Sequence, residues 1–276
     1  MNRLSALILI LFVCFIPACM PAPAKYTELE SGVLDVEDSQ SILIQVDHGE
    51  VIVLGTEGQQ AQVKGQVLFV DELEYQVRST EEQISIKAFT HRKGFSDIPP
   101  LRLEVRVPKQ IQVKIETDSA SVSVQDYEGV LEVDSTSGII TIEQLAGKIT
   151  LYSNRGNITV RESSGNISIV GNYGALNVQN VYGETAISTI MGNVVFNGLI
   201  RTGDTVRLET DHGSVSVNLS PDSALSLQVR STSGNVACVL PDINSSTRTC
   251  DGEIRSGGGI LSIRTVSGAV TLQMIP

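Results

Sequence analysis

Glycine recurs at every ninth residue through the middle of the chain, and this period limits the folds open to it. The eight glycines are Gly129, Gly138, Gly147, Gly156, Gly165, Gly174, Gly183 and Gly192. The second and fourth residues after each glycine are mostly apolar, as in the run Gly-Lys-Ile-Thr-Leu that starts at Gly147. Alternation of this kind, rich in β-branched residues, predicts short strands with one buried face. Nine residues hold one strand and one turn, too few for a helical crossover.

A second, longer period appears three positions before each glycine. In every other unit this position is Thr117, Ser135, Ser153, Gly171 or Thr189, and in the remaining units it is Asp126, Gln144, Glu162 or Asn180. Two kinds of corner therefore alternate, so two units make one coil of 18 residues and equivalent residues stack about 4.8 Å apart. The glycine spacing then opens to 21 at Gly213 and Gly234. We predict an all-β fold, a single-stranded parallel β-helix (β-solenoid) with about 18–21 residues per coil and right-handed crossovers.

The segment before the regular coils has longer and less regular strand candidates. They cover Ser41–Val46, Gln62–Val70, Gln83–Phe89 and Leu101–Val107. The terminal units of solenoids are atypical because they shield the open end of a stacked core. We therefore predict one solenoid domain over residues 28–276, in which 28–110 form an irregular N-terminal cap with wider coils and 111–276 form regular coils.

The N-terminus has the pattern of an export signal. Arg3 precedes an apolar run from Leu4 to Ile16, which is too short to span a membrane. The sequence Ile-Pro-Ala-Cys that ends at Cys19 resembles a bacterial lipobox, in which the cysteine is lipidated and becomes the mature N-terminus. We expect a lipoprotein signal peptide at 1–18, a tether at 19–27 and a lipid anchor on Cys19 in the bacterial cell envelope. Plain secretion and an uncleaved anchor stay open as alternatives.

Two cysteines remain after the signal region. Because an exported chain meets oxidising conditions, Cys238 and Cys250 are predicted to form a disulfide. The loop it would close is short, and the expected stabilisation is about 3 kcal/mol in the chain-entropy model. Neither histidine nor further cysteine lies nearby in sequence to complete a zinc site, so no metal is expected there.

The charge of the chain argues against nucleic acid as a partner. The formal net charge is −11, and the 20 Lys and Arg residues are scattered. Phosphate backbones are held mainly by clustered basic side chains. The nearest approach to a cluster is His91-Arg92-Lys93, which we interpret as a solvated loop tip.

Several stretches resemble a known bacterial family. They are Val107-Pro108 leading into Ile115-Glu116-Thr117, the coil Ser135–Ile142, and the ending Thr265–Gly268. On these residues the chain resembles the DUF4097 family, whose members are often described as candidate adhesins and are β-solenoids of the envelope or surface. The resemblance implies a fold and a location. It implies no catalytic residues, and we expect no cofactor.

Calcium is the chemistry that nine-residue glycine repeats most readily suggest, because the calcium-binding β-roll has the same period. Its turns require a recurrent aspartate. The turns here carry Ser, Thr and Asn instead, as around Ser135, Ser153 and Asn172. Repeated calcium sites are therefore not expected, and a single ion at Asp47 or Asp211 has no further support.

Catalysis has weak support in the sequence. Glycoside hydrolysis needs two carboxylates about 5–10 Å apart. Among the outward positions three after each glycine, only Glu132 is acidic; two pairs of acids could approach each other, Asp126 with Glu128 and Asp134 with Glu143. The three histidines are His48, His91 and His212, and serines are too common for a triad to stand out.

We predict a non-catalytic binding or scaffold protein of the envelope, similar to an adhesin. The alternatives are a polysaccharide lyase or glycosidase on a β-helix, and an accessory or sensor factor in the envelope stress response. Hydroxyl and amide side chains on the strand faces, with Tyr152, Tyr173 and Tyr182 near corners, suit contact with a glycan or an envelope protein. The sequence assigns no individual ligand-binding residue.

Overall fold

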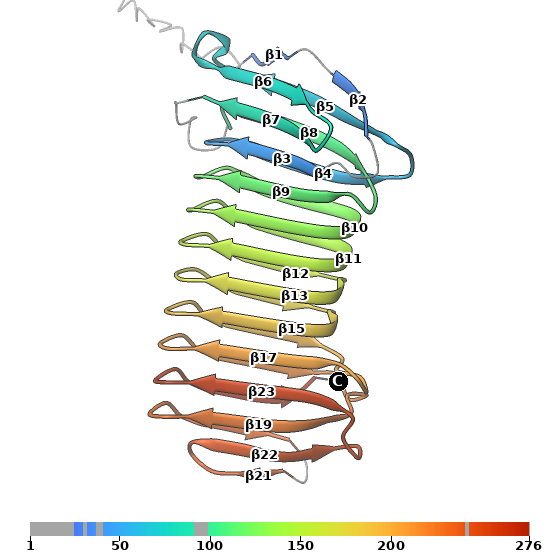
Figure 1. Ribbon diagram of the computed structural model, residues 1–276. Coiled ribbons are helices and arrows are strands. Elements are labelled where there is room, and N and C mark those ends of the chain that lie inside the picture. The colour runs from blue at the N-terminus through green and yellow to red at the C-terminus, as the bar shows by residue number, and fades with distance from the viewer. Residues whose placement is uncertain (1–24, 30–31, 37–40, 91–98, 241–242, 276) are drawn as a thin grey trace, which may run out of the picture.

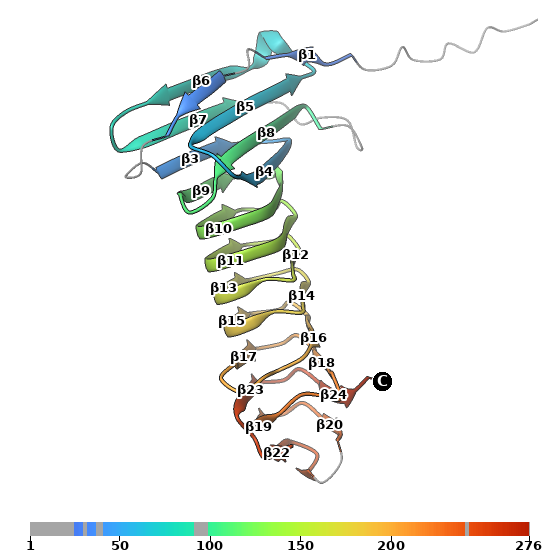
Figure 2. The same ribbon diagram turned by 90° about the vertical axis from the view of Figure 1, so that its right-hand side faces the viewer.

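The described residues contain 24 strands, which form one sheet that winds into a β-solenoid and confirm the predicted fold (Figures 1 and 2). The computed structural model describes residues 25–29, 32–36, 41–90, 99–240 and 243–275. Cys19, the predicted signal peptide and the cluster starting at His91 lie outside these ranges. Within them, no helix is long and apolar enough to cross a membrane. The one helical element among the described residues is a 3-10 turn, η1 (Val70–Glu72).

Each coil places one strand in each of two walls. From the cap to the far end, the first wall contains β6 (Glu74–Ser79), β7 (Gln83–Phe89), β3 (Ser41–Val46), β9 (Gln112–Thr117), the second halves of β10 (Ser121–Ser135) and β11 (Ile140–Ser153), β13 (Ser164–Gly171), β15 (Tyr182–Thr189), β17 (Thr205–Thr210), β23 (Gly259–Thr265), β19 (Leu225–Ser231), β22 (Thr249–Ile254) and β21 (Asn244–Ser245). All neighbours from β7 to β19 pair in parallel.

The second wall closes the other side of the core. In the same direction it contains β1 (Thr27–Glu28) and β2 (Gly32–Asp35), β5 (Gln60–Val67), β8 (Leu101–Pro108), β4 (Glu50–Thr56), the first halves of β10 and β11, β12 (Ile158–Arg161), β14 (Leu176–Gln179), β16 (Val194–Gly198), β18 (Val215–Leu219), β24 (Val270–Met274) and β20 (Val236–Val239). The apolar side chains of both walls meet in one continuous core.

The two alternating corners have different structures. At the first, which we call the hydroxyl corner, a buried Ser or Thr side chain accepts a hydrogen bond from the backbone N–H three residues later. Ser153 Oγ accepts from Gly156 at 2.8 Å, and Ser135 Oγ accepts from Gly138 at 3.0 Å. The same bond recurs at Thr117, Thr189, Thr210, Ser231 and Thr265. The hydroxyl column therefore satisfies buried donors and serves the fold.

At the second corner, which we call the left-handed corner, the polar residues take backbone angles that side chains rarely adopt. The φ angles are 53° at Asp126, 54° at Gln144, 50° at Glu162 and 51° at Asn180. Each lies in the left-handed region, and the glycine three residues later also has positive φ. This difference in backbone geometry is why the two corners carry different residues.

The nine-residue glycine period is a consequence of two stacked columns. From Gly156 onward, each glycine of the hydroxyl corner lies against the carbonyl group of a glycine in the adjacent coil, as Gly156 does against Gly138 and Gly174 against Gly156. The same close approach joins Gly147 to Gly129 and Gly165 to Gly147 at the left-handed corner. A side chain has no room in either column.

Chain order and spatial order separate at the C-terminal end. The last coil, β23 and β24, pairs with β17 and β18 on one side and with the earlier strands β19 and β20 on the other. Thr265 thus stacks directly on Thr210, and Ser231 follows it. Beyond β19, β22 pairs antiparallel with it and β21 pairs antiparallel with β22 to end the first wall. A disulfide joins Cys238 of β20 to Cys250 of β22.

Candidate functional site

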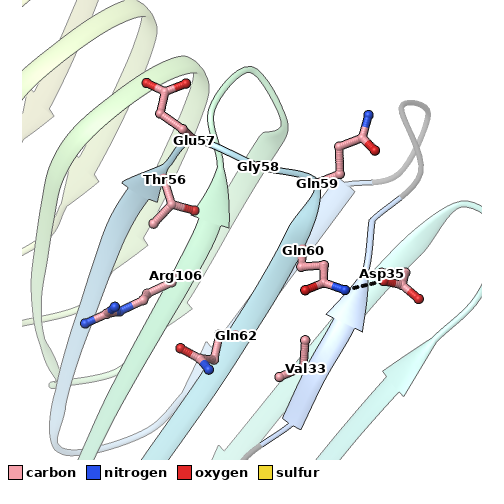
Figure 3. Close-up of a pocket in the computed structure, with 9 residues that line it drawn as sticks. All are labelled: Val33, Asp35, Thr56, Glu57, Gly58, Gln59, Gln60, Gln62 and Arg106. Carbon is pink, nitrogen blue, oxygen red and sulfur yellow. Dashed lines mark hydrogen bonds between the residues drawn. The ribbon is translucent and has the colours of Figure 1, made fainter.

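The cap carries a groove on its outer surface, where the turn between β4 and β5 passes β2 (Figure 3). β8 pairs with β4 on one side and with β5 on the other, so this turn has to cross the end of β8. The groove has a volume of about 670 Å³. Its lining consists of Val33, Asp35, Thr56, Glu57, Gly58, Gln59, Gln60, Gln62 and Arg106.

Side-chain amides give this groove its chemical character. Gln60 Nε2 donates to Asp35 Oδ1 at 2.8 Å, a bond that joins β5 to β2 (Figure 3). No described residue hydrogen-bonds the amides of Gln59 or Gln62. Each of these amides offers two donors and an acceptor carbonyl, so the groove presents unused capacity of both kinds.

The charged groups at the ends of the groove already have partners. Arg106 Nε lies 2.9 Å from Glu104 Oε1. Lys109 Nζ donates a hydrogen bond to Glu57 Oε1 at 2.8 Å, and this bond is the main reason why the pKa of Lys109 is raised. Asp35 is the one carboxylate of the lining without an ion pair among the described residues, so the groove disfavours an anion and suits a neutral polar ligand.

The three tyrosines of the sequence analysis do not form one site. Tyr152 and Tyr173 lie in neighbouring coils at the hydroxyl corner, where the Asn172 amide hydrogen-bonds the Tyr152 hydroxyl at 3.3 Å. Tyr182 begins β15 after the left-handed corner, on the opposite edge, and its ring lies 3.9 Å from the guanidinium carbon of Arg201. Only the first two can share a partner.

The two pairs of acids that the sequence singled out are arranged differently in the structure. Asp134 belongs to the first wall and Glu143 to the second, where Arg161 lies 3.3 Å from the Glu143 carboxylate. The approach of Asp134 to Glu143 that the sequence left open therefore does not occur, because the core lies between the two walls. Asp126 and Glu128 do line one shallow hollow at the left-handed corner, where Glu128 lies 3.7 Å from Lys109.

The acidic residue picked out on the strand faces belongs to a network of ion pairs. Lys114 Nζ lies 3.1 Å from both Glu132 Oε1 and Glu116 Oε1. Hydrogen bonds donated by Gln45 and Lys114 lower the pKa of Glu116, and the bond from Gln45 has the larger effect. A carboxylate neutralised in this way stabilises the wall and is poorly placed as an acid or base. Among the described residues, no group of three or more His, Cys, Asp and Glu side chains is arranged to hold a metal ion.

Two of the three histidines, His48 and His212, occupy matching positions near the two ends of the hydroxyl corner. His48 Nδ1 lies 2.5 Å from Ser119 Oγ, and His212 Nδ1 lies 2.8 Å from Ser267 Oγ. In both cases the serine belongs to the turn of the adjacent coil. Asp47 Oδ1 accepts the backbone N–H of His48 at 2.7 Å. The repetition indicates a contact that links stacked turns.

The fold defines the protein as a parallel β-solenoid with irregular ends. The chain belongs to the DUF4097 family, since the family model described as Toastrack DUF4097 matches residues 33–273. The family resemblance seen in the sequence is thereby confirmed. A comparison with curated proteins gives no match.

A comparison with solved structures finds similar chains at low sequence identity. A candidate adhesin from Bacteroides fragilis is 10% identical, with a TM-score of 0.51 over 91% of this chain and 99% of its own. A candidate adhesin from Parabacteroides distasonis is 11% identical, with a TM-score of 0.45 over 91% of this chain and 98% of its own. A candidate lipid-binding protein from the same species is 9% identical, with a TM-score of 0.43 over 88% and 96%. At these identities the likeness concerns the fold alone.

Proposed function

We propose that this protein is a non-catalytic, adhesin-like binding protein of the bacterial cell envelope, and that the groove of the cap holds a glycan. The observation that carries the proposal is the pair of amides, Gln59 and Gln62, that face the groove with no described partner. Sugar hydroxyls both donate and accept hydrogen bonds, and a side-chain amide matches both roles. Val33 adds an apolar contact for the face of a sugar ring.

The place of the groove in the molecule narrows the ligand further. The described chain enters the solenoid through β1 at the cap end (Figure 2). A lipid on Cys19 would be separated from Tyr26 by a short segment that reaches at most about 25 Å when extended. The groove would then lie close to the membrane, with the regular coils pointing away from it. We therefore propose that the ligand is a polysaccharide of the envelope itself.

The glycan proposal is tested with a double variant. Gln59→Ala combined with Gln62→Ala removes both amides and leaves the Gln60 to Asp35 bond in place. We expect the affinity of the purified full chain for its best ligand on an array of bacterial envelope glycans to fall about 10- to 100-fold, at about 1 kcal/mol or slightly more for each lost hydrogen bond. Binding is measured by titration of the ligand that the wild-type chain selects.

Gln228→Ala is the matched control, because Gln228 is an exposed amide of β19 in the first wall, far along the solenoid from the cap. It should leave glycan affinity unchanged. Wild-type protein that retains no envelope glycan, or a double variant that binds as well as wild type, would contradict the proposal.

The lipid anchor is tested separately. Replacing Cys19 by Ser removes the thiol that would carry the lipid, so we expect the protein to move from the membrane fraction to the soluble fraction of lysed cells. Cys14→Ser changes a cysteine inside the predicted signal peptide and should leave the protein on the membrane. If the Cys19→Ser chain stays with the membrane, the anchor is assigned to the wrong residue.

A further inference from the structure

The turns of the hydroxyl corner stack into a straight edge that runs the length of the regular coils, seen as the loops on the left of Figure 1. Backbone hydrogen bonds hold neighbouring turns in register: Tyr173 N–H donates to Asn154 at 2.9 Å, and Met191 N–H donates to Asn172 at 3.0 Å. Rows of side chains on this edge are therefore separated by one strand spacing, about 4.8 Å. We call this the turn edge.

Two neighbouring rows in the middle of the turn edge are apolar and exposed. The exposed fractions are 48% for Tyr173, 43% for Ile190 and 56% for Met191, and Val170 adjoins them on β13. Equivalent turns nearer the two ends carry mostly Ser, Thr and Asp in these positions, as at Ser137, with one apolar exception, Val266, which is 44% exposed in the row of Arg264. A row of apolar side chains held outward on a rigid turn is typical of a surface that is covered in a complex.

Charged rows flank the apolar rows, and their order is antisymmetric. On the cap side the next row carries Arg155 and the one before it Asp134. On the far side the next row carries Glu209 and Asp211. All are exposed, and none forms an ion pair with another described residue. The row after that carries Arg264, which is also exposed and forms no ion pair with another described residue.

We propose that the turn edge is the interface of a symmetric dimer, in which a second copy of the chain packs antiparallel against the first. A two-fold axis between the rows of Tyr173 and Met191 superposes the apolar rows of the two copies. The Tyr173 ring of each chain then faces the Met191 thioether of the other, a favourable sulfur–aromatic contact. Such an interface is isologous, because each copy contributes the same surface.

The same axis pairs the flanking charges correctly. Arg155 of one copy meets the row of Asp211 and Glu209 of the other, and one row further out Asp134 meets Arg264. A parallel arrangement in register would set like charges against each other. The antisymmetric order of charge is what favours a second copy over a glycan or an unrelated protein.

The arrangement sets the two caps at opposite ends of the dimer. If Cys19 carries the lipid anchor, as proposed above, each dimer would join two membrane surfaces by like-with-like contact. This last step rests on the proposed function; the dimer itself does not. The interface is narrow, since only turn residues meet, so association in the class of weak and transient contacts is expected.

The proposal is tested by sedimentation of the purified full chain in density-matched detergent. We expect wild-type protein to form dimers as its concentration rises. Arg155→Glu and Asp211→Arg should each weaken dimerisation at least tenfold, because like charges then meet twice across the axis. Equimolar mixing of the two variants should restore dimers, because in the mixed dimer both contacts join opposite charges.

Arg207→Glu is the matched control, since Arg207 is an exposed guanidinium of β17 that points out of the first wall away from the turn edge. It should dimerise as wild type does, and circular dichroism should show all variants folded. Wild-type protein that remains monomeric at every concentration overturns the dimer. Single variants that dimerise normally, or a mixture that fails to recover, overturn the antiparallel geometry; so does loss of glycan binding by the edge variants with no change in mass.

Discussion

Ile158→Asp is expected to destabilise the protein by at least about 4 kcal/mol, enough to unfold much of the solenoid. Ile158 is fully buried and lies between Ile140 and Leu176 in the adjacent coils of the second wall. A carboxylate at this position loses its hydration, and the surrounding side chains are apolar. The free energy of unfolding is measured by urea titration followed by circular dichroism.

Ile139 provides a close control for this substitution. It is 53% exposed and lies one turn position before Ile140 in the adjacent coil. Ile139→Asp should change the unfolding free energy by less than about 0.5 kcal/mol, since its carboxylate stays in water. Equal stability losses for the two variants would show that the inward register of the second wall is wrong.

Gly156→Ala is expected to cost about 3 kcal/mol or more, although it adds only a methyl group. That methyl would overlap the carbonyl oxygen of Gly138 and lie 2.8 Å from its carbonyl carbon and from Ser153 Oγ. None of these atoms can move away cheaply, because Gly138 belongs to the backbone of the adjacent coil and Ser153 Oγ holds the Gly156 N–H. The melting temperature should fall accordingly.

Gly32→Ala separates this effect from the general cost of replacing glycine. A methyl group at Gly32 would meet no atom within 4 Å, and its backbone does not require glycine. The melting temperature of this variant should match that of wild type. If the Gly156→Ala chain melted at the same temperature as the Gly32→Ala chain, the turns of Gly156 and Gly138 would not be in contact.

The periodic part of the fold follows closely from its sequence. The alternation of hydroxyl residues with Asp126, Gln144, Glu162 and Asn180 predicted two corners and an 18-residue coil, and the register of β10 on β11 and β11 on β13 has that offset. The physical reason is local: each coil repeats the same hydrogen bond and the same close approach of glycine, so a residue pattern reports directly on geometry.

The ends of the solenoid could be predicted less well from the sequence, because their strands pair with partners that are distant in sequence. No residue pattern in β23 predicts that this strand inserts between β17 and β19. The groove depends on β2 and β8 lying on either side of β5, with antiparallel pairings on both sides. The cluster Gln59, Gln60 and Gln62 was visible in the sequence, but only the folded cap turns it into one wall of a groove.

The turn edge could be predicted from the sequence in part. Tyr173 and Tyr182 each precede a glycine of the nine-residue period, yet Gly174 belongs to the hydroxyl corner and Gly183 to the left-handed corner. The two-corner interpretation therefore already separates these tyrosines onto opposite edges. The alternation of charge along the edge could not be predicted without the stacking order at the C-terminal end, because Arg264 joins the edge only through the inserted coil.

The inserted coil also determines when the molecule can be complete. β19 to β22 are made before β23 and β24, yet they lie beyond them in the stack, so the far end of the solenoid can pack in place only when β23 and β24 fill the gap beside β17 and β18. A chain still emerging from a ribosome or an export channel lacks this coil. The stack can therefore close only after β24 has been made, and termination before β23 would open the core in its interior instead of shortening it at one end.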